Sequence, residues 1–189
     1  YGAVHGPFTP AKRHFDNYPD AKVKIPKDVY PPRKGKPEYS RNKEQWVKGP
    51  NGLPVLKAGR FSGRTVSGKF IHGTDIHSLE RQYNQGVLAI DEGVGKLIKA
   101  LKETGQYDNT LIVFGADQGI AWGQKGYQMK LAPYDGTIRG PLIMSMPKKF
   151  PTGKVCPKPV GGADLVPTFF KTAGVELPWK MHGRDLTPL

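Results

Sequence analysis

Cysteine is almost absent from this chain, which has Cys156 as its only one in 189 residues. One thiol cannot form an intramolecular disulfide framework or a metal site built from several cysteines. The chain also lacks a run of residues long and apolar enough to cross a bilayer, so no membrane span is expected. Residues 1–6 show neither the charged nor the apolar part of a signal peptide and do not begin with Met, so we expect Tyr1 to be internal to a longer polypeptide.

Acidic residues are scarce in the first part of the chain. Residues 1–72 carry 15 of the 29 Lys and Arg residues but only 5 of the 16 Asp and Glu residues, in a chain of net charge +13. Such a basic segment could bind a polyanion, or it could be a solvated surface, and both interpretations remain open. Because no nucleic-acid-binding motif is present, we expect no nucleic-acid partner.

Hydrophobic periodicity is also missing from residues 1–72, which contain half of the 18 prolines. Proline removes a backbone donor and disfavours helix around it, so we expect residues 5–42 to form an extended, loop-rich segment on the surface of a larger fold. A loop of this length is unusual in a compact domain. It indicates either a substrate-facing loop or a segment whose partner sequence lies elsewhere.

Residues 73–189 show the patterns of regular structure. Apolar residues recur at three- and four-residue steps over residues 78–104, which predicts an amphipathic helix that ends at Gly105. The apolar face of this helix consists of Leu79, Tyr83, Val87, Ile90, Val94, Leu97, Ile98 and Leu101. Two continuous apolar runs, residues 111–115 and 141–146, are typical of buried strands.

A second helix is predicted to begin at Asp164 as its N-cap and to end at Gly174. Its expected buried face consists of Leu165, Val166, Phe169 and Phe170. The order helix, strand, strand, helix predicts an α/β layer.

Asp117 and Gln118 follow the first predicted strand directly and precede Gly119, which would let the backbone turn so that both side-chain oxygens converge. Carboxylate and amide oxygens suit Ca²⁺ or Mg²⁺, but Ca²⁺ takes about 6–8 oxygen ligands, so these two cannot form a site alone. Satisfying backbone groups at a turn is the other interpretation of both side chains.

The run from Asn109 to Met146 resembles the sulfatase family. It combines an Asn-Thr-apolar strand, Asp-Gln-Gly, a Gly-Gln-Lys-Gly loop, a lone lysine, then Tyr-Asp-Gly-Thr-Ile-Arg-Gly-Pro and an apolar strand. The segment Val-His-Gly-Pro-Phe at residues 4–8 and the helix start Asp-Leu-Val-Pro-Thr at residues 164–168 are similar to the family too. The resemblance implies an alkaline-phosphatase-like α/β sandwich with a mixed sheet flanked by helices.

The resemblance also implies roles for particular residues. Asp117 and Gln118 would be two ligands of an active-site Ca²⁺, with Gln in place of the usual Asn, and Mg²⁺ as the other possible ion. Lys130 would contact the sulfate, and His5 would bind it or protonate the leaving oxygen. A cation, an ammonium and an imidazole aimed at a sulfate ester would stabilise the charge that gathers in its transition state.

Lys125 departs from the family pattern, in which this position often holds a histidine near the ester. A lysine there could pair with a carboxylate or with a second sulfate on a glycan, or it could be a solvated loop residue. Trp122 could stack on a sugar ring, although a tryptophan more often belongs to a core.

The motif that yields the family's formylglycine nucleophile, Cys/Ser-x-Pro/Ala-x-Arg, is missing from the chain. Cys156 lies in Cys-Pro-Lys-Pro-Val, which lacks both the third and the fifth residue of that motif, and no Asp-Asp pair precedes His5. We therefore expect residues 1–189 to be part of a sulfatase catalytic domain, composed of a loop-rich basic segment, 1–72, and a helix-strand-loop-strand-helix core, 73–189.

The sequence thus predicts part of a sulfuric ester hydrolase that acts on a sulfated carbohydrate or an aryl sulfate. Residues 1–189 by themselves are expected to be inactive. The resemblance implies export to the periplasm or outside the cell. Two alternatives stay open. One is a phosphoester hydrolase of the same superfamily, and the other is a non-catalytic polyanion-binding remnant that uses the basic residues 1–72.

Overall fold

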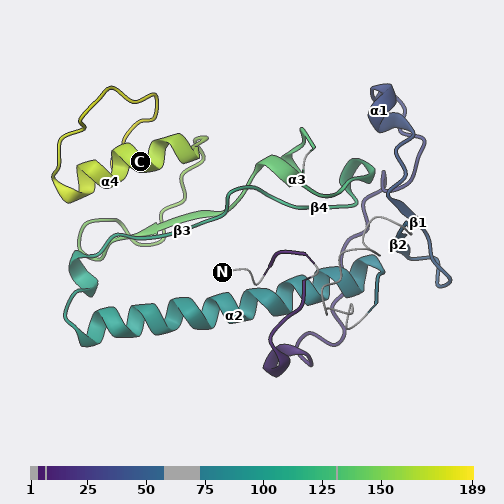
Figure 1. Ribbon diagram of the computed structural model, residues 1–189, viewed down its shortest axis with the longest axis horizontal. Helices are drawn as coiled ribbons and strands as arrows, with labels where there is room; N and C mark the ends of the chain where they lie inside the picture. Colours follow the sequence, from purple (N-terminus) through teal and green to yellow (C-terminus); the bar gives the residue numbers. More distant parts are fainter. Residues whose placement is uncertain (1–3, 7, 58–72, 131) are drawn as a thin grey trace. The chain divides into compact units, whose positions relative to one another are not determined.

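The computed structural model describes residues 4–6, 8–57, 73–130 and 132–189 (Figure 1). These residues divide between two compact units. The first unit comprises Tyr1–Leu97 and Gln118–Arg139, and the second comprises Ile98–Asp117 and Gly140–Leu189. The basic residues at the start of the chain therefore fold with the loop that follows Asp117.

The first unit is built around a small apolar core. Its buried members are Phe8, Val29, Trp46, Ile76 and Leu79. Three of these five come from the proline-rich part of the chain, which also forms a 3₁₀ turn at Lys12–His14, the short helix α1 (Glu38–Arg41), and strands β1 (Trp46–Lys48) and β2 (Pro54–Leu56). Residues 5–42 are loop-rich as predicted, but they do not merely cover a surface, because they supply side chains to the core.

Helix α2, Ile76–Glu103, is the longest element and is drawn in teal in Figure 1. It begins where the Asp75 carboxylate accepts hydrogen bonds from the backbone N–H groups of His77 and Ser78, each at 3.0 Å. The predicted helix is therefore present, starting two residues earlier than expected. Its predicted apolar face is covered unevenly, since Leu79 is buried and Ile98 is half-buried, whereas Leu97 is 60 % exposed.

Each described sheet is an antiparallel pair of strands. β1 pairs with β2, β4 (Ala121–Trp122) with β5 (Gln128–Met129), and β3 (Ile112–Gly115) with β6 (Leu142–Ser145). Both predicted strands exist with shorter bounds, as β3 and β6, but the prediction that they are buried is wrong. Ile143 is 62 % exposed, and no residue of β3 or β6 is fully buried. The described residues thus combine helices with antiparallel strand pairs.

Helix α4, Leu165–Ala173, ends as predicted at Gly174, which has a left-handed φ of +71°. The predicted buried face is wrong, since Val166 and Phe169 are exposed and the buried residues are Pro167 and Thr168. Asp164 occupies the N-cap position as predicted, but its side chain makes no capping hydrogen bond to the first turn of α4. Its carboxylate instead accepts backbone N–H groups of Gly161 and Arg184, each at 2.9 Å, and so joins the start of α4 to the C-terminal segment.

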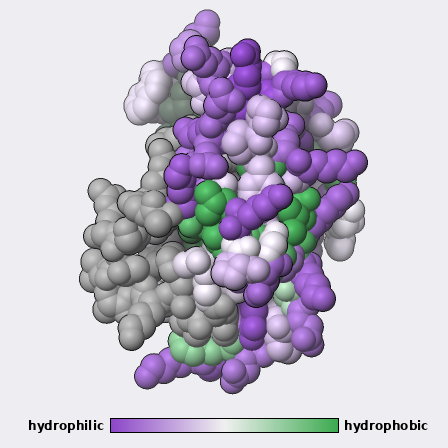
Figure 2. Space-filling view, turned by 90° about the vertical axis from the view of Figure 1, so that its right-hand side faces the viewer, coloured by the Kyte–Doolittle hydropathy of each residue, from purple (hydrophilic) through white to green (hydrophobic). Residues whose placement is uncertain are grey.

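The remaining elements are short. They are 3₁₀ turns at Tyr107–Asn109, Gln124–Gly126 and Gly162–Asp164, and helix α3, Asp135–Ile138. Within the described ranges, no helix combines the length and hydrophobicity that a bilayer crossing requires. The face shown in Figure 2 is predominantly hydrophilic, with a smaller hydrophobic area near its centre, in keeping with a chain of which 24 % is charged.

Candidate active site

Gln118–Arg139, in the first unit, holds most of the residues predicted to act in chemistry. Gly119 joins the two ends of this segment. Its N–H donates to the carbonyl oxygen of Thr137 at 3.0 Å, and a Cβ at position 119 would lie 2.6 Å from the carbonyl oxygen of Gly136. A glycine is needed here because two stretches of backbone approach closely. The close approach holds Gln118 beside the α3 segment.

The Gly-Gln-Lys-Gly sequence forms the turn between β4 and β5. Gly123 donates its N–H to the carbonyl oxygen of Tyr127 at 2.9 Å, and Trp122 pairs with Gln128 across the strands. Lys125 has a φ of +55°, which is uncommon for a residue with a side chain and costs about 1–2 kcal/mol. Such a conformation persists only where the surroundings hold it in place.

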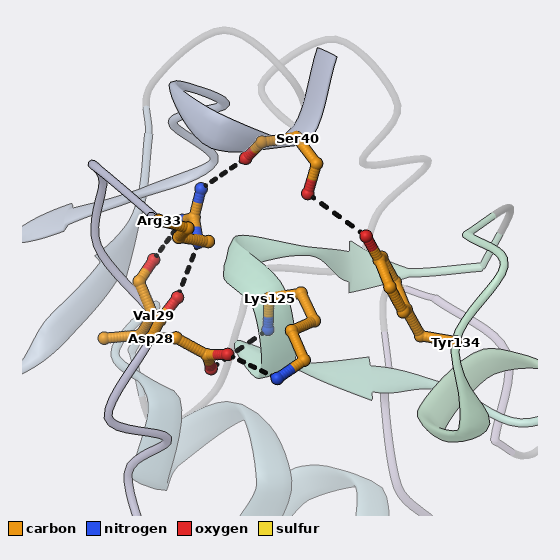
Figure 3. Close-up of polar contacts among 6 residues, drawn as sticks. All are labelled: Asp28, Val29, Arg33, Ser40, Lys125 and Tyr134. Carbon is orange, nitrogen blue, oxygen red and sulfur yellow. Dashed lines mark hydrogen bonds and ion pairs between the residues drawn. The ribbon is translucent and has the colours of Figure 1, made fainter. Parts of the chain in front are cut away.

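Asp28 holds Lys125 through two contacts (Figure 3). Its Oδ1 accepts the backbone N–H of Lys125 at 3.1 Å, and its Oδ2 accepts the Lys125 Nζ at 2.8 Å. Partial burial raises the pKa of the Asp28 carboxyl, but the hydrogen bonds and the charge of Lys125 together outweigh it and lower that pKa below its usual range. Of the alternatives for Lys125, the structure shows the pairing with a carboxylate.

Arg33 anchors the loop that carries Asp28. The guanidinium is buried and donates to four backbone carbonyl oxygens at 2.7–2.9 Å, those of Asp28, Val29, Ser40 and Lys43. Its bonds to Val29 and Ser40 are drawn in Figure 3. Burial lowers the pKa of Arg33, and the Asp28 charge opposes this effect. Sequence reasoning missed Arg33, because nothing in a proline- and lysine-rich run distinguishes one cation from its neighbours.

Further side chains from residues 34–46 support the β4–β5 hairpin from outside. Trp46 donates its Nε1–H to the carbonyl oxygen of Tyr127 at 3.1 Å. The ring of Tyr127 lies 5.7 Å from that of Tyr134, and the ammonium groups of Lys43 and Lys36 lie over these two rings at 4.7 and 5.6 Å. Two lysines of the basic segment are thus engaged by aromatic faces.

Trp122 forms an aromatic triangle with Phe8 and Tyr83. Its ring centroid lies 5.3 Å from that of Phe8 and 5.4 Å from that of Tyr83, and the Phe8 and Tyr83 centroids are 5.9 Å apart. Such tilted and edge-on pairs stabilise a core. This environment matches the core interpretation of Trp122, and its stacking on a sugar remains a prediction.

His5 and Lys130 also belong to the first unit. His5 is exposed, and its Nδ1 lies 3.0 Å from the carbonyl oxygen of Gly6. Lys130 is half-buried and follows β5 directly. Asp117 differs from the other predicted residues, since it belongs to the second unit, where it is exposed. The half-buried Gln118 begins the loop of the first unit.

The ligands that the described residues offer can be compared with those that the predicted Ca²⁺ site needs. Asp117 and Gln118 offer hard oxygen ligands, but they are two of the about 6–8 that Ca²⁺ takes. Among residues 4–6, 8–57, 73–130 and 132–189, no group of three or more His, Cys, Asp or Glu side chains gathers in a way that could hold a metal ion. These residues therefore fit part of a calcium site and not a whole one.

Comparison with known proteins gives a consistent result. The model of the Sulfatase family matches residues 2–175. An N-acetylglucosamine-6-O-sulfatase of Bacteroides thetaiotaomicron is 36 % identical over 124 residues, which cover 66 % of this chain and 22 % of that protein. This chain thus spans about a fifth of that curated relative.

Two solved structures extend the comparison. One, described as a complex with its substrate D-glucosamine-2-N,6-O-disulfate, matches 97 % of this chain and 45 % of its own, with a TM-score of 0.71 and 25 % identity. The other, a phosphonate monoester hydrolase from Silicibacter pomeroyi, matches 60 % of this chain and 22 % of its own, with a TM-score of 0.56 and 39 % identity.

Proposed function

Since the chain belongs to the sulfatase family and shares the alkaline-phosphatase-like α/β fold of solved relatives, we propose that the protein carrying it hydrolyses sulfate esters. The observation that supports this most is the close approach of Gly119 to Thr137 and Gly136. It brings Gly119 of the Asp-Gln-Gly motif against the Tyr-Asp-Gly-Thr-Ile-Arg segment, and both motifs belong to the family resemblance.

Asp117 and Gln118 are proposed to supply two oxygen ligands to Ca²⁺, with Mg²⁺ as the other candidate. When bound, the cation would stabilise negative charge on the sulfate group. Lys130 is proposed to donate hydrogen bonds from its ammonium to a sulfate oxygen. His5 is proposed to bind the sulfate or to protonate the leaving oxygen, since imidazole is the side chain that most often serves as a general acid.

The nucleophile and the missing calcium ligands are proposed to come from residues other than these 189. The chain contains no Cys/Ser-x-Pro/Ala-x-Arg sequence from which a formylglycine is made, and its only cysteine, Cys156, is exposed in the second unit. Consequently, residues 1–189 by themselves are expected to show no sulfatase turnover.

A sulfated carbohydrate is the proposed substrate class, and an aryl sulfate is expected to serve as a chromogenic one. The relative from Bacteroides thetaiotaomicron is named as an N-acetylglucosamine-6-O-sulfatase, and the solved complex contains D-glucosamine-2-N,6-O-disulfate as its substrate. Lys125 and Trp122 are proposed to contact the sugar. Export to the periplasm or the outside of the cell is proposed with this substrate class, since sulfated glycans are extracellular polymers.

The test uses the full-length product of the gene that encodes this chain. Its kcat/KM for 4-nitrophenyl sulfate is compared with that for 4-nitrophenyl phosphate and for a phosphonate monoester, with Ca²⁺ present. A higher value for the sulfate is the expected result. Turnover of the phosphorus esters with no turnover of the sulfate would reject the proposal.

A phosphoester or phosphonate hydrolase is the second candidate. The phosphonate monoester hydrolase from Silicibacter pomeroyi favours it, since it is 39 % identical over the matched part. An ammonium and a divalent cation would stabilise a phosphoryl group by the same electrostatic means. The three-substrate comparison therefore decides between the two candidates.

A further inference from the structure

Lys125 has a fixed partner on a segment that shares no motif with the sulfatase resemblance. We infer that Asp28 is a positioning residue for Lys125, and that the Asp28–Lys125 pair selects a neutral hydroxyl or amide of the substrate over a second anionic group. The selectivity part rests on the proposed function, in which Lys125 contacts the substrate.

Several contacts fix the pair. The two oxygens of Asp28 bind the backbone N–H and the Nζ of the same lysine, so both the main chain and the side chain of Lys125 are held. Arg33 in turn fixes the Asp28 backbone by donating its Nε–H to the Asp28 carbonyl oxygen at 2.7 Å. An ammonium on a flexible stem is thereby placed at one position, which reduces the entropy lost on binding a ligand.

The pair keeps polar capacity for a ligand. The side chains of Lys125 and Asp28 are 38 % and 32 % exposed. The Lys125 ammonium has three N–H donors, of which Asp28 takes one, and a carboxylate oxygen has more than one lone pair. A hydroxyl could therefore accept a hydrogen bond from Lys125 while it donates one to Asp28.

A second sulfate gains less from the paired lysine than it would from a lone one. A sulfate oxygen that accepts from Nζ at about 2.8 Å would lie no further than about 6 Å from the Asp28 Oδ2. The carboxylate repels the sulfate at that separation and offsets part of its attraction to the nearer ammonium, and the sulfate has no proton to donate to Asp28. The pairing thus shifts the expected preference of Lys125 away from anions and toward neutral polar groups that can both accept and donate hydrogen bonds.

The test measures selectivity in the full-length gene product. The substrates are N-acetyl-D-glucosamine 6-sulfate, which carries a neutral amide, and D-glucosamine-2-N,6-O-disulfate, which carries an anionic sulfamate in its place. Asp28→Asn removes the negative charge and keeps an acceptor, so we expect the ratio of kcat/KM, disulfate over monosulfate, to rise about threefold. Asp20→Asn, at an exposed position of the same segment, makes the same charge change as a control.

A ratio that stays at the wild-type value in Asp28→Asn, or that rises equally in Asp20→Asn, would overturn the selectivity. The positioning role has its own measurement, the rate at which acetic anhydride modifies Lys125, followed by peptide mass spectrometry with the exposed Lys149 as internal reference. We expect this rate to rise relative to Lys149 in Asp28→Asn, and an unchanged rate would overturn the positioning role.

The two proposals fail in different ways. If the wild-type protein hydrolyses neither sulfated sugar, the proposed function and the selectivity that rests on it are rejected together. The modification rate of Lys125 still decides whether Asp28 positions it, because that measurement needs no turnover.

Discussion

Gly126 lies directly against the guanidinium of Arg33, so closely that a Cβ at position 126 would overlap its terminal nitrogen. The contact packs the turn that carries Lys125 onto the arginine that fixes the Asp28 loop. Gly126 also has a left-handed φ of +72°. Two independent reasons therefore require a glycine at this position.

Gly126→Ala is expected to destabilise the protein by about 3 kcal/mol or more, because it combines about 1–2 kcal/mol of left-handed strain with displacement of a buried arginine that donates four hydrogen bonds. Gly35→Ala is the matched control, since Gly35 has the same φ of +72° but open space around it. The control should lose only the strain component. The midpoint of urea unfolding measures both variants, and equal losses would contradict the packing argument.

Gly119→Ala tests the close approach of the two motif segments. Its added methyl group would collide with the carbonyl oxygens of Gly136 and Arg139, so the loop must shift. We expect a fall in kcat/KM for an aryl sulfate of about tenfold or more, since small misplacements of active-site groups cost about that much or more. Gly95→Ala has open space at its Cβ and lies within α2, so it should leave activity unchanged.

Unaltered activity in Gly119→Ala would show that the proposed role of Gln118 as a ligand does not require the close approach of Gly119 to the α3 segment. Circular dichroism of the variant separates a local shift from general unfolding.

Lys130→Ala and His5→Ala are each expected to lower kcat for an aryl sulfate by about 100-fold, because each removes a donor aimed at developing negative charge. Lys149→Ala and His182→Ala serve as controls, since both residues are exposed in the other unit. Retention of full activity in either test variant would remove that residue from the proposed site.

Asp117→Asn is expected to raise the Ca²⁺ concentration needed for half-maximal activity by about tenfold or more, since it removes the charge of one proposed ligand. Activity lost on treatment with EGTA should return when Ca²⁺ is added back to the wild-type protein. Asp135→Asn, on the exposed surface of α3, is the control. The same Ca²⁺ dependence in both variants would argue against Asp117 as a ligand.

Asp164 is predicted to make stability depend on pH. Hydrogen bonds from the backbone N–H groups of Arg184 and Gly161 lower the pKa of its carboxyl below the usual value of about 3.9. A lowered folded-state pKa means that the stabilisation is complete above the unfolded-state pKa and is lost as the pH falls through the folded-state one.

The stability difference between wild type and Asp164→Asn should therefore shrink as the pH is lowered below about 4. Thermal unfolding measured from pH 7 to pH 3 tests this expectation, with Glu176→Gln as a control at an exposed position. A difference that stays constant over this range would mean that the two backbone hydrogen bonds do not depend on the charge of Asp164.

The family and the local elements could be predicted from the sequence alone. The long helix, the strands β3 and β6, and the stop at Gly174 follow from periodicity, apolar runs and a glycine with positive φ, all of which are properties of neighbouring residues. The motif residues Asp117, Gln118, Lys125 and Lys130 were likewise recognisable from their order and spacing.

The surroundings of those residues depend on contacts between segments that are far apart in the sequence. Asp28 and Lys125 are 97 positions apart, and Arg33 meets Gly126 from an equally distant segment, so no local pattern could reveal either pair. The same limit explains the wrong predictions of burial, as at Phe169 and Ile143. A hydrophobic pattern indicates which face can be covered, but whether it is covered depends on the elements that pack there.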